Sequence, residues 1–131
     1  MKNNLTLTIF SLLTLLLGII HISDDIVRGM SPGGFGNLIA IAVSVIWLYG
    51  TLVLAGRRSG YIIILVMSFL MTGIPAIHMR GHGVGFGTTR SDGLFFVWTL
   101  FALGVTGLFS FILAARALWS PRKGTGPRST S

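Results

Sequence analysis

The residues of this sequence that are best suited to chemistry are its three histidines and one aspartate. His21 and Asp25 are four residues apart, a spacing that brings two side chains together on one face of a helix. His78 and His82 occur later in the chain. Imidazole and carboxylate groups are ligands for zinc, copper and iron. The sequence therefore predicts a metal site made of His21, Asp25, His78 and His82.

Other side chains could extend this metal site, and two other roles fit the same histidines and aspartate. Methionine thioethers could add soft ligands for cuprous copper, and the candidates are Met67, Met71 and Met79. His21 and His78 could instead be the axial ligands of a haem, or His21 and Asp25 could exchange protons without any metal. No spacing in the sequence selects one cofactor from these alternatives.

A purely structural role is the simplest interpretation of this cluster. His21, Asp25 and Arg28 share one face of a helix if that helix continues past Ile22. They would then form a hydrogen-bonded network of charges that holds the helix ends together. In this interpretation His78 and His82 are solvated. Because an unpaired imidazole close to the membrane is poorly solvated, His21 in particular is expected to have a partner.

Four apolar stretches must position these side chains. Each is close to the roughly 20 residues that a helix needs to cross a bilayer, and none contains an acid, a lysine or an arginine. They cover residues 5–22, 38–55, 61–77 and 94–115. We therefore expect an all-α protein, an integral membrane four-helix antiparallel bundle. Its membrane domain is expected to cover residues 1–119, followed by a disordered, basic cytoplasmic tail at residues 120–131.

The basic residues are distributed unequally between the two sides of such a bundle. The side of the termini carries seven lysines and arginines and no acid, whereas the other side carries three arginines and all three acids. The positive-inside rule then places both termini in the cytoplasm, for example of a bacterial inner membrane. The net charge of +7 is explained by topology and by contacts with anionic lipids, and does not indicate nucleic-acid binding.

The first stretch also has one feature of a secretory signal, the basic residue Lys2. Its apolar run of 18 residues is longer than the 7 to 15 residues that are usual in signal peptides, and no small-x-small cleavage site follows. We therefore expect it to be retained as a membrane span. Cleavage would leave three spans and an external N-terminus.

Packing between the spans can be predicted from small residues, which let helix backbones approach in lipid. Pairs at four-residue spacing occur in every span, at Thr14 and Gly18, Ala40 and Ser44, Ser68 and Thr72, and Ser110 and Ala114. The short connection at residues 56–60 should make the second and third spans antiparallel neighbours. Trp47 lies in the middle of its span and is expected to be a packing residue, whereas Tyr61 and Trp119 fit a membrane interface.

Several function classes are disfavoured by composition. The chain has no cysteine, which excludes thiolate ligands and disulfides. It resembles the small multidrug exporters in length and number of spans, but it lacks the glutamate that these exporters carry in their first span, because it contains no glutamate at all. Paired carboxylates and catalytic constellations of serine, histidine and acid are also absent, so we do not expect an enzyme.

Two function classes remain. The first, and the leading prediction, is an accessory or interaction subunit whose lipid-facing helices recognise a membrane protein partner or a second copy of the chain. The second is a small protein that binds or senses a ligand, a metal or protons through the cluster of histidine and aspartate. Membrane lipids are expected partners in both cases.

Overall fold

A computed structural model describes residues 2–27, 29, 34–80 and 91–120, and within these residues the chain forms four α-helices and no strands. The helices are α1 (Lys2–Val27), α2 (Phe35–Leu52), α3 (Arg58–Arg80) and α4 (Ser91–Trp119). All four are long and apolar enough to cross a membrane. The prediction of an all-α chain with four membrane-length helices is therefore confirmed, while residues 121–131 of the predicted tail lie outside the described residues.

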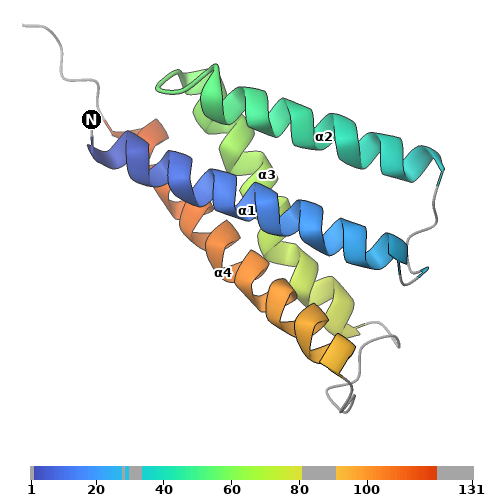
Figure 1. Ribbon diagram of the computed structural model, residues 1–131. Helices are drawn as coiled ribbons and strands as arrows, with labels where there is room; N and C mark the ends of the chain where they lie inside the picture. The colour runs from blue at the N-terminus through green and yellow to red at the C-terminus, as the bar shows by residue number, and fades with distance from the viewer. Residues whose placement is uncertain (1, 28, 30–33, 81–90, 121–131) are drawn as a thin grey trace, which may run out of the picture.

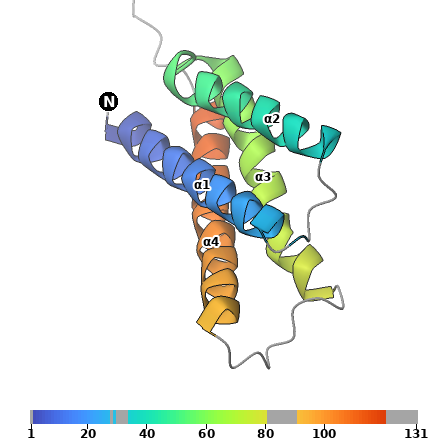
Figure 2. The same cartoon turned by 45° about the vertical axis from the view of Figure 1, so that its right-hand side comes forward.

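Successive helices run in opposite directions (Figures 1 and 2). The most extensive contact joins α3 to α4, and α1 packs mainly against α4. The start of α1, the turn from α2 to α3 and the end of α4 lie together at one end of the molecule (Figure 1). We call this end the basic end, because Arg57, Arg58 and Arg116 belong to it. The last turns of α1 and α3 lie at the opposite end, where the candidate site is found.

Small residues allow α3 and α4 to approach closely. A Cβ atom added at Gly104 of α4 would lie 2.8 Å from Cγ of Pro75, and one added at Gly107 would lie 3.0 Å from the Thr72 hydroxyl of α3. Pro75 is inside α3 and has no backbone N–H, so the carbonyl one turn earlier loses its helical donor. The ring of Pro75 fits against the glycine of the neighbouring helix, and this contact fixes α3 at a point one turn before His78.

Buried hydroxyl groups join α1 to α2 and to α4. The indole Nε1 of Trp47 donates a hydrogen bond of 2.8 Å to the Ser11 hydroxyl, which is also 2.7 Å from the Thr51 hydroxyl. On the other side of α1, the hydroxyls of Thr14 and Ser110 are 3.1 Å apart. Trp47 is only 1 % exposed, which confirms that it is a packing residue. Such hydrogen bonds and the small residues beside them stabilise the contacts between these helices.

The turn between α2 and α3 depends on glycines. Gly56 has a positive φ of 78°, a conformation that other L-residues rarely adopt. A Cβ atom at Gly60 would collide with the Leu54 carbonyl oxygen and would lie 2.8 Å from the Gly50 carbonyl oxygen. The backbones of α2 and α3 therefore come into direct contact at the basic end, and the two helices are antiparallel neighbours.

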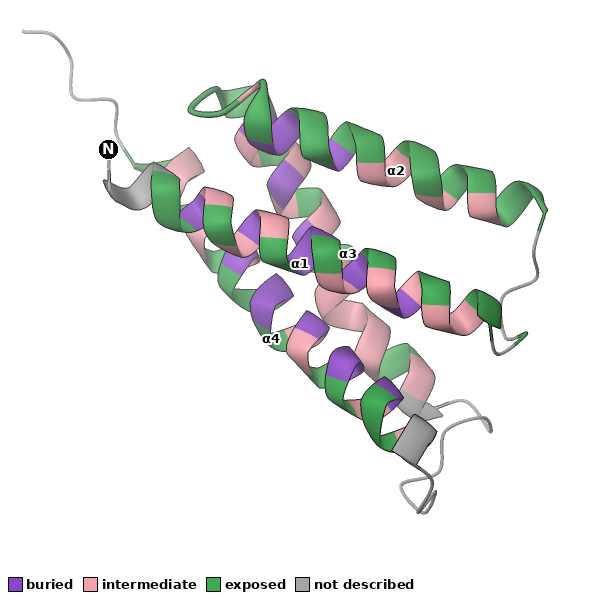
Figure 3. Cartoon of the chain, viewed as in Figure 1, coloured by how far each residue is buried: buried purple, intermediate pink, exposed green. Residues whose placement is uncertain are grey.

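The first half of α2 packs loosely. The large apolar side chains of this half are mostly exposed, and α2 and α1 border an apolar groove of about 440 Å³. Ala40 and Ser44 line this groove, so this pair of small residues does not close a helix contact as expected. Figure 3 shows the same distribution, with exposed residues along most of α2 and buried residues on the inner faces of α1 and α4.

Candidate metal site

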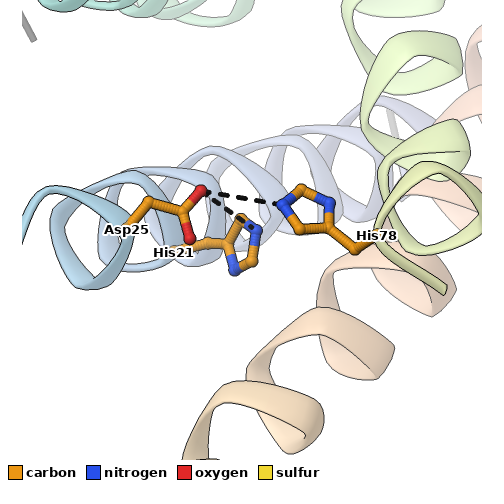
Figure 4. Close-up of side chains that lie close together, drawn as sticks. All are labelled: His21, Asp25 and His78. Carbon is orange, nitrogen blue, oxygen red and sulfur yellow. Dashed lines mark ion pairs between the residues drawn. The ribbon is translucent and has the colours of Figure 1, made fainter. Parts of the chain in front are cut away.

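Two helices bring His21, Asp25 and His78 together at the end of the bundle opposite the basic end. α1 continues without a break to Val27, and this continuation places His21 and Asp25 on one face, at i and i+4. His78 comes from the last turn of α3. The carboxylate Oδ2 of Asp25 lies 3.8 Å from His21 Nε2 and 3.7 Å from His78 Nε2. The three side chains point toward one another from the two helices (Figure 4).

Three polar atoms of this cluster are buried without hydrogen-bond partners among the described residues. His21 is 1 % exposed, and neither of its ring nitrogens has a partner within the described residues. The same is true of Asp25 Oδ1. A buried polar group without a partner costs about 1–3 kcal/mol, so folded proteins rarely retain one without a reason. An ion or a proton shared among these atoms would supply that reason.

His78 is held in the orientation and tautomer that a metal ligand needs. Its Nδ1 lies 3.0 Å from the backbone carbonyl oxygen of Ile74. A carbonyl can only accept a hydrogen bond, so the proton of the neutral ring must be on Nδ1. The lone pair is then on Nε2, the atom that faces Asp25. Histidine ligands in metal proteins are commonly fixed in this way, through a hydrogen bond from the other ring nitrogen.

An apolar side chain from α4 closes the cluster. The ring centroid of Phe96 lies 5.0 Å from that of His21 and 5.8 Å from that of His78, and Phe96 is 2 % exposed. On the inner side, both Met71 Sδ and Leu103 lie within 4 Å of the position of a Cβ on Gly18, about one turn of α1 from His21. This surrounding has a low polarity, which strengthens any electrostatic interaction among the three polar side chains.

The distances fit a single metal ion. One ligand atom from each of the three residues can be chosen so that all lie within 4.8 Å of one another. Ligand atoms about 2.1 Å from a tetrahedral ion are roughly 3.4 Å apart. The Asp25 oxygen is already within about 0.4 Å of that spacing from each imidazole nitrogen, whereas a pair of ligand atoms 4.8 Å apart would have to approach by about 1.4 Å. A haem between the two histidines fits less well, because the rings of His21 and His78 are in edge contact, with centroids 5.0 Å apart.

The other residues named from the sequence are placed differently. His82 and Arg28 lie outside the described residues, and the side chains of Met79 and Arg80 are not described. Met67 and Met71 pack against the apolar core. The three-residue cluster therefore contains three of the four predicted ligands.

Two groups that contribute to the site were not predicted from the sequence. Phe96 is one apolar residue within an apolar stretch, and nothing in its sequence context distinguishes it. The Ile74 carbonyl, which orients His78, is a backbone group and carries no signal in the residue type. Only the four-residue spacing between Ile74 and His78 within one helix could have indicated it.

No protein-family model, no curated protein and no solved structure matches this chain.

Proposed function

We propose that this chain is an integral membrane protein that binds one divalent transition-metal ion between His21, Asp25 and His78. The observation that carries the proposal is the buried imidazole of His21, whose two nitrogens lack hydrogen-bond partners within the described residues although a carboxylate and a second imidazole lie beside it. Two imidazoles and one carboxylate form a ligand set that suits Zn²⁺ or Fe²⁺. Three protein ligands would leave at least one position for water or another ligand.

A binding or sensing role is better supported than transport through the bundle. Beyond the site, side-chain atoms of Met71 and Leu103 lie within 4 Å of the position that a Cβ on Gly18 would occupy, at the next turn. Further along, the Thr14 and Ser110 hydroxyls are 3.1 Å apart, and the Thr14 hydroxyl also donates to the Phe10 carbonyl. These side chains fill the space through which an ion would have to move. The ion would therefore enter and leave from the same end.

Metal binding by the purified full-length chain tests this proposal. In mild detergent at pH 7.5 we expect one Co²⁺ or Zn²⁺ per chain, with d–d absorption of Co²⁺ typical of a site that has nitrogen and oxygen ligands. At pH 5.5 the affinity should fall at least tenfold, because protons compete for the imidazole ligands. Within the described residues, the titratable groups around His21 are Asp24, Asp25 and His78, and α4 contributes the apolar Phe96.

Two results would contradict metal binding: the absence of saturable binding at pH 7.5, or an affinity that does not change between pH 7.5 and 5.5. Proton exchange among the same three side chains, without a metal, is the alternative interpretation. It predicts a structural response to pH in metal-free protein, which tryptophan fluorescence would detect.

We also propose that both termini lie in the cytoplasm and that the metal site faces the outer side of a bacterial inner membrane. The support is the distribution of charge: the sequence has seven lysines and arginines and no acid on the side of the termini, and three of them, Arg57, Arg58 and Arg116, lie at the basic end. The three acids of the sequence lie on the opposite side of the predicted spans.

Reporter fusions in a bacterial host test this orientation. Green fluorescent protein fused after residue 131 should be fluorescent, and alkaline phosphatase at the same position should be inactive, because the former folds in the cytoplasm and the latter after export. The reverse pattern should appear when the reporters follow residue 80. An active phosphatase at the C-terminal position would contradict the proposed topology.

An accessory subunit of a membrane complex is the second candidate function. It is favoured by the exposed apolar side chains of α2 and by the groove that α2 forms with α1. Purification in mild detergent, followed by identification of co-eluting chains, would distinguish the two. A partner in stoichiometric amount supports the accessory role, and a bound metal ion supports the first proposal.

A further inference from the structure

A second pocket lies at the basic end, far from the metal site. It has a volume of about 500 Å³ and lies between the first turn of α3 and the last turn of α4. Figures 1 and 2 both show these two helix ends side by side. Arg58 and Tyr61 line it from α3, and Leu118 and Trp119 line it from α4.

The charge around this pocket is positive. Arg58 contributes to its wall, and Arg57 and Arg116 belong to the same end of the molecule. The chain has only three acids. Asp24 and Asp25 lie near the end of α1, and Asp92 lies in the first turn of α4, so all three are at the other end. Among the described residues, an anionic ligand would therefore meet attraction here and no opposing side-chain carboxylate.

The remaining walls match the chemistry of a lipid molecule. Trp119 is 80 % exposed, and tryptophan and tyrosine side chains at helix ends typically lie at the level of lipid headgroups. Ala117 and Leu118 give the pocket an apolar side. A free phosphate ion could use the arginine but would gain nothing from this apolar side, whereas the glycerol and the first acyl carbons of a phospholipid would pack against it.

We propose that this pocket binds the headgroup of an anionic phospholipid. The guanidinium of Arg58 contacts the phosphate through two parallel N–H donors, as arginine does with phosphate groups in general. Basic pockets between membrane helices on the cytoplasmic side recognise anionic headgroups in other proteins. The site is independent of the metal site, because it uses other residues at the opposite end of the bundle.

Native mass spectrometry of the full-length protein in mild detergent tests the proposal. After incubation with equal amounts of phosphatidylglycerol and phosphatidylcholine, the wild type should retain one phosphatidylglycerol in preference. Arg58→Gln should lower the retained fraction about tenfold, because it removes a charged hydrogen bond to the phosphate. Arg57→Gln is the matched control, since Arg57 is the next residue but does not line the pocket. It should change retention only about twofold.

Three results would overturn the proposal. Equal losses in the two variants would indicate a diffuse basic surface. Equal retention of both lipids would indicate an apolar site that does not recognise charge. Displacement of the lipid by millimolar inorganic phosphate would indicate an anion site. If Arg58→Gln fails to fold, Arg58→Lys carries the test, because it keeps the charge and loses the paired donors. Retention of phosphatidylglycerol equal to that of the wild type would then overturn the proposal.

Discussion

Replacement of His78 by alanine should lower the affinity for Zn²⁺ by roughly a hundredfold and leave the four-helix fold intact. The substitution removes one of the two imidazole ligands, together with the nitrogen that the Ile74 carbonyl orients. The side chain of His78 is 28 % exposed, so its loss opens no large cavity in the core. Competition with a chelating dye measures the affinity, and circular dichroism reports the helices.

Asp25→Asn should have a similar effect, because it removes the negative charge that balances the ion.

Asp24→Asn is the matched control for Asp25→Asn. It removes the same charge from the same turn of α1, but Asp24 does not belong to the three-residue cluster. The affinity should therefore change only about twofold. His82→Ala addresses the fourth ligand predicted from the sequence, which lies outside the described residues. A loss as large as that of His78→Ala would add His82 to the site. Equal effects of Asp24→Asn and Asp25→Asn would contradict the proposed ligand set.

The second large effect is expected at the turn between α2 and α3. Gly60→Ala should destabilise the protein by about 2–3 kcal/mol, because the new methyl group would collide with the Leu54 carbonyl oxygen and would crowd that of Gly50. These are backbone atoms, which cannot move aside without shifting the helices. The free energy of unfolding can be measured by circular dichroism in mixed micelles that contain increasing amounts of sodium dodecyl sulfate.

Gly73→Ala is the control for this substitution. Gly73 belongs to the same helix, but among the described residues no atom other than those of its own stretch of helix lies within 4 Å of the position of its missing Cβ atom. Because alanine is the better helix former, the variant should be as stable as the wild type or more stable by up to about 1 kcal/mol. If Gly60→Ala and Gly73→Ala had the same stability, the close approach of α2 and α3 would not contribute to the fold.

The helices could be predicted because each one arises from a continuous stretch of the sequence. Four uncharged apolar stretches of membrane length are a property of the sequence alone, and each became a helix. The boundaries were less predictable: α1 runs to Val27 instead of ending near Ile22, whereas α2 ends at Leu52 instead of reaching Ala55. The continuation of α1 through Asp24 and Asp25 shows that this helix does not end where its apolar stretch ends.

The site was predictable only in part. The pairing of His21 with Asp25 follows from helical spacing, so it required no knowledge of the tertiary structure. The approach of His78 depends on how α3 packs against α4, and the position of Phe96 depends on the same packing. Small residues predicted some contacts, as at Thr14 and Ser110. They failed at Ala40 and Ser44, which line a groove, because a small residue permits a close contact but does not select the partner.

Pro75 weakens the connection between the last turn of α3 and the preceding part of the helix. The missing backbone donor weakens the helix at the place where the ring of Pro75 is anchored against Gly104. The last turn of α3, which carries His78, can therefore rotate about the anchored Pro75. A rotation of this turn would move the imidazole of His78 relative to His21 and Asp25 while the remaining helices stay in place. Capture of an ion would then require only a local adjustment, and its release would leave the architecture unchanged.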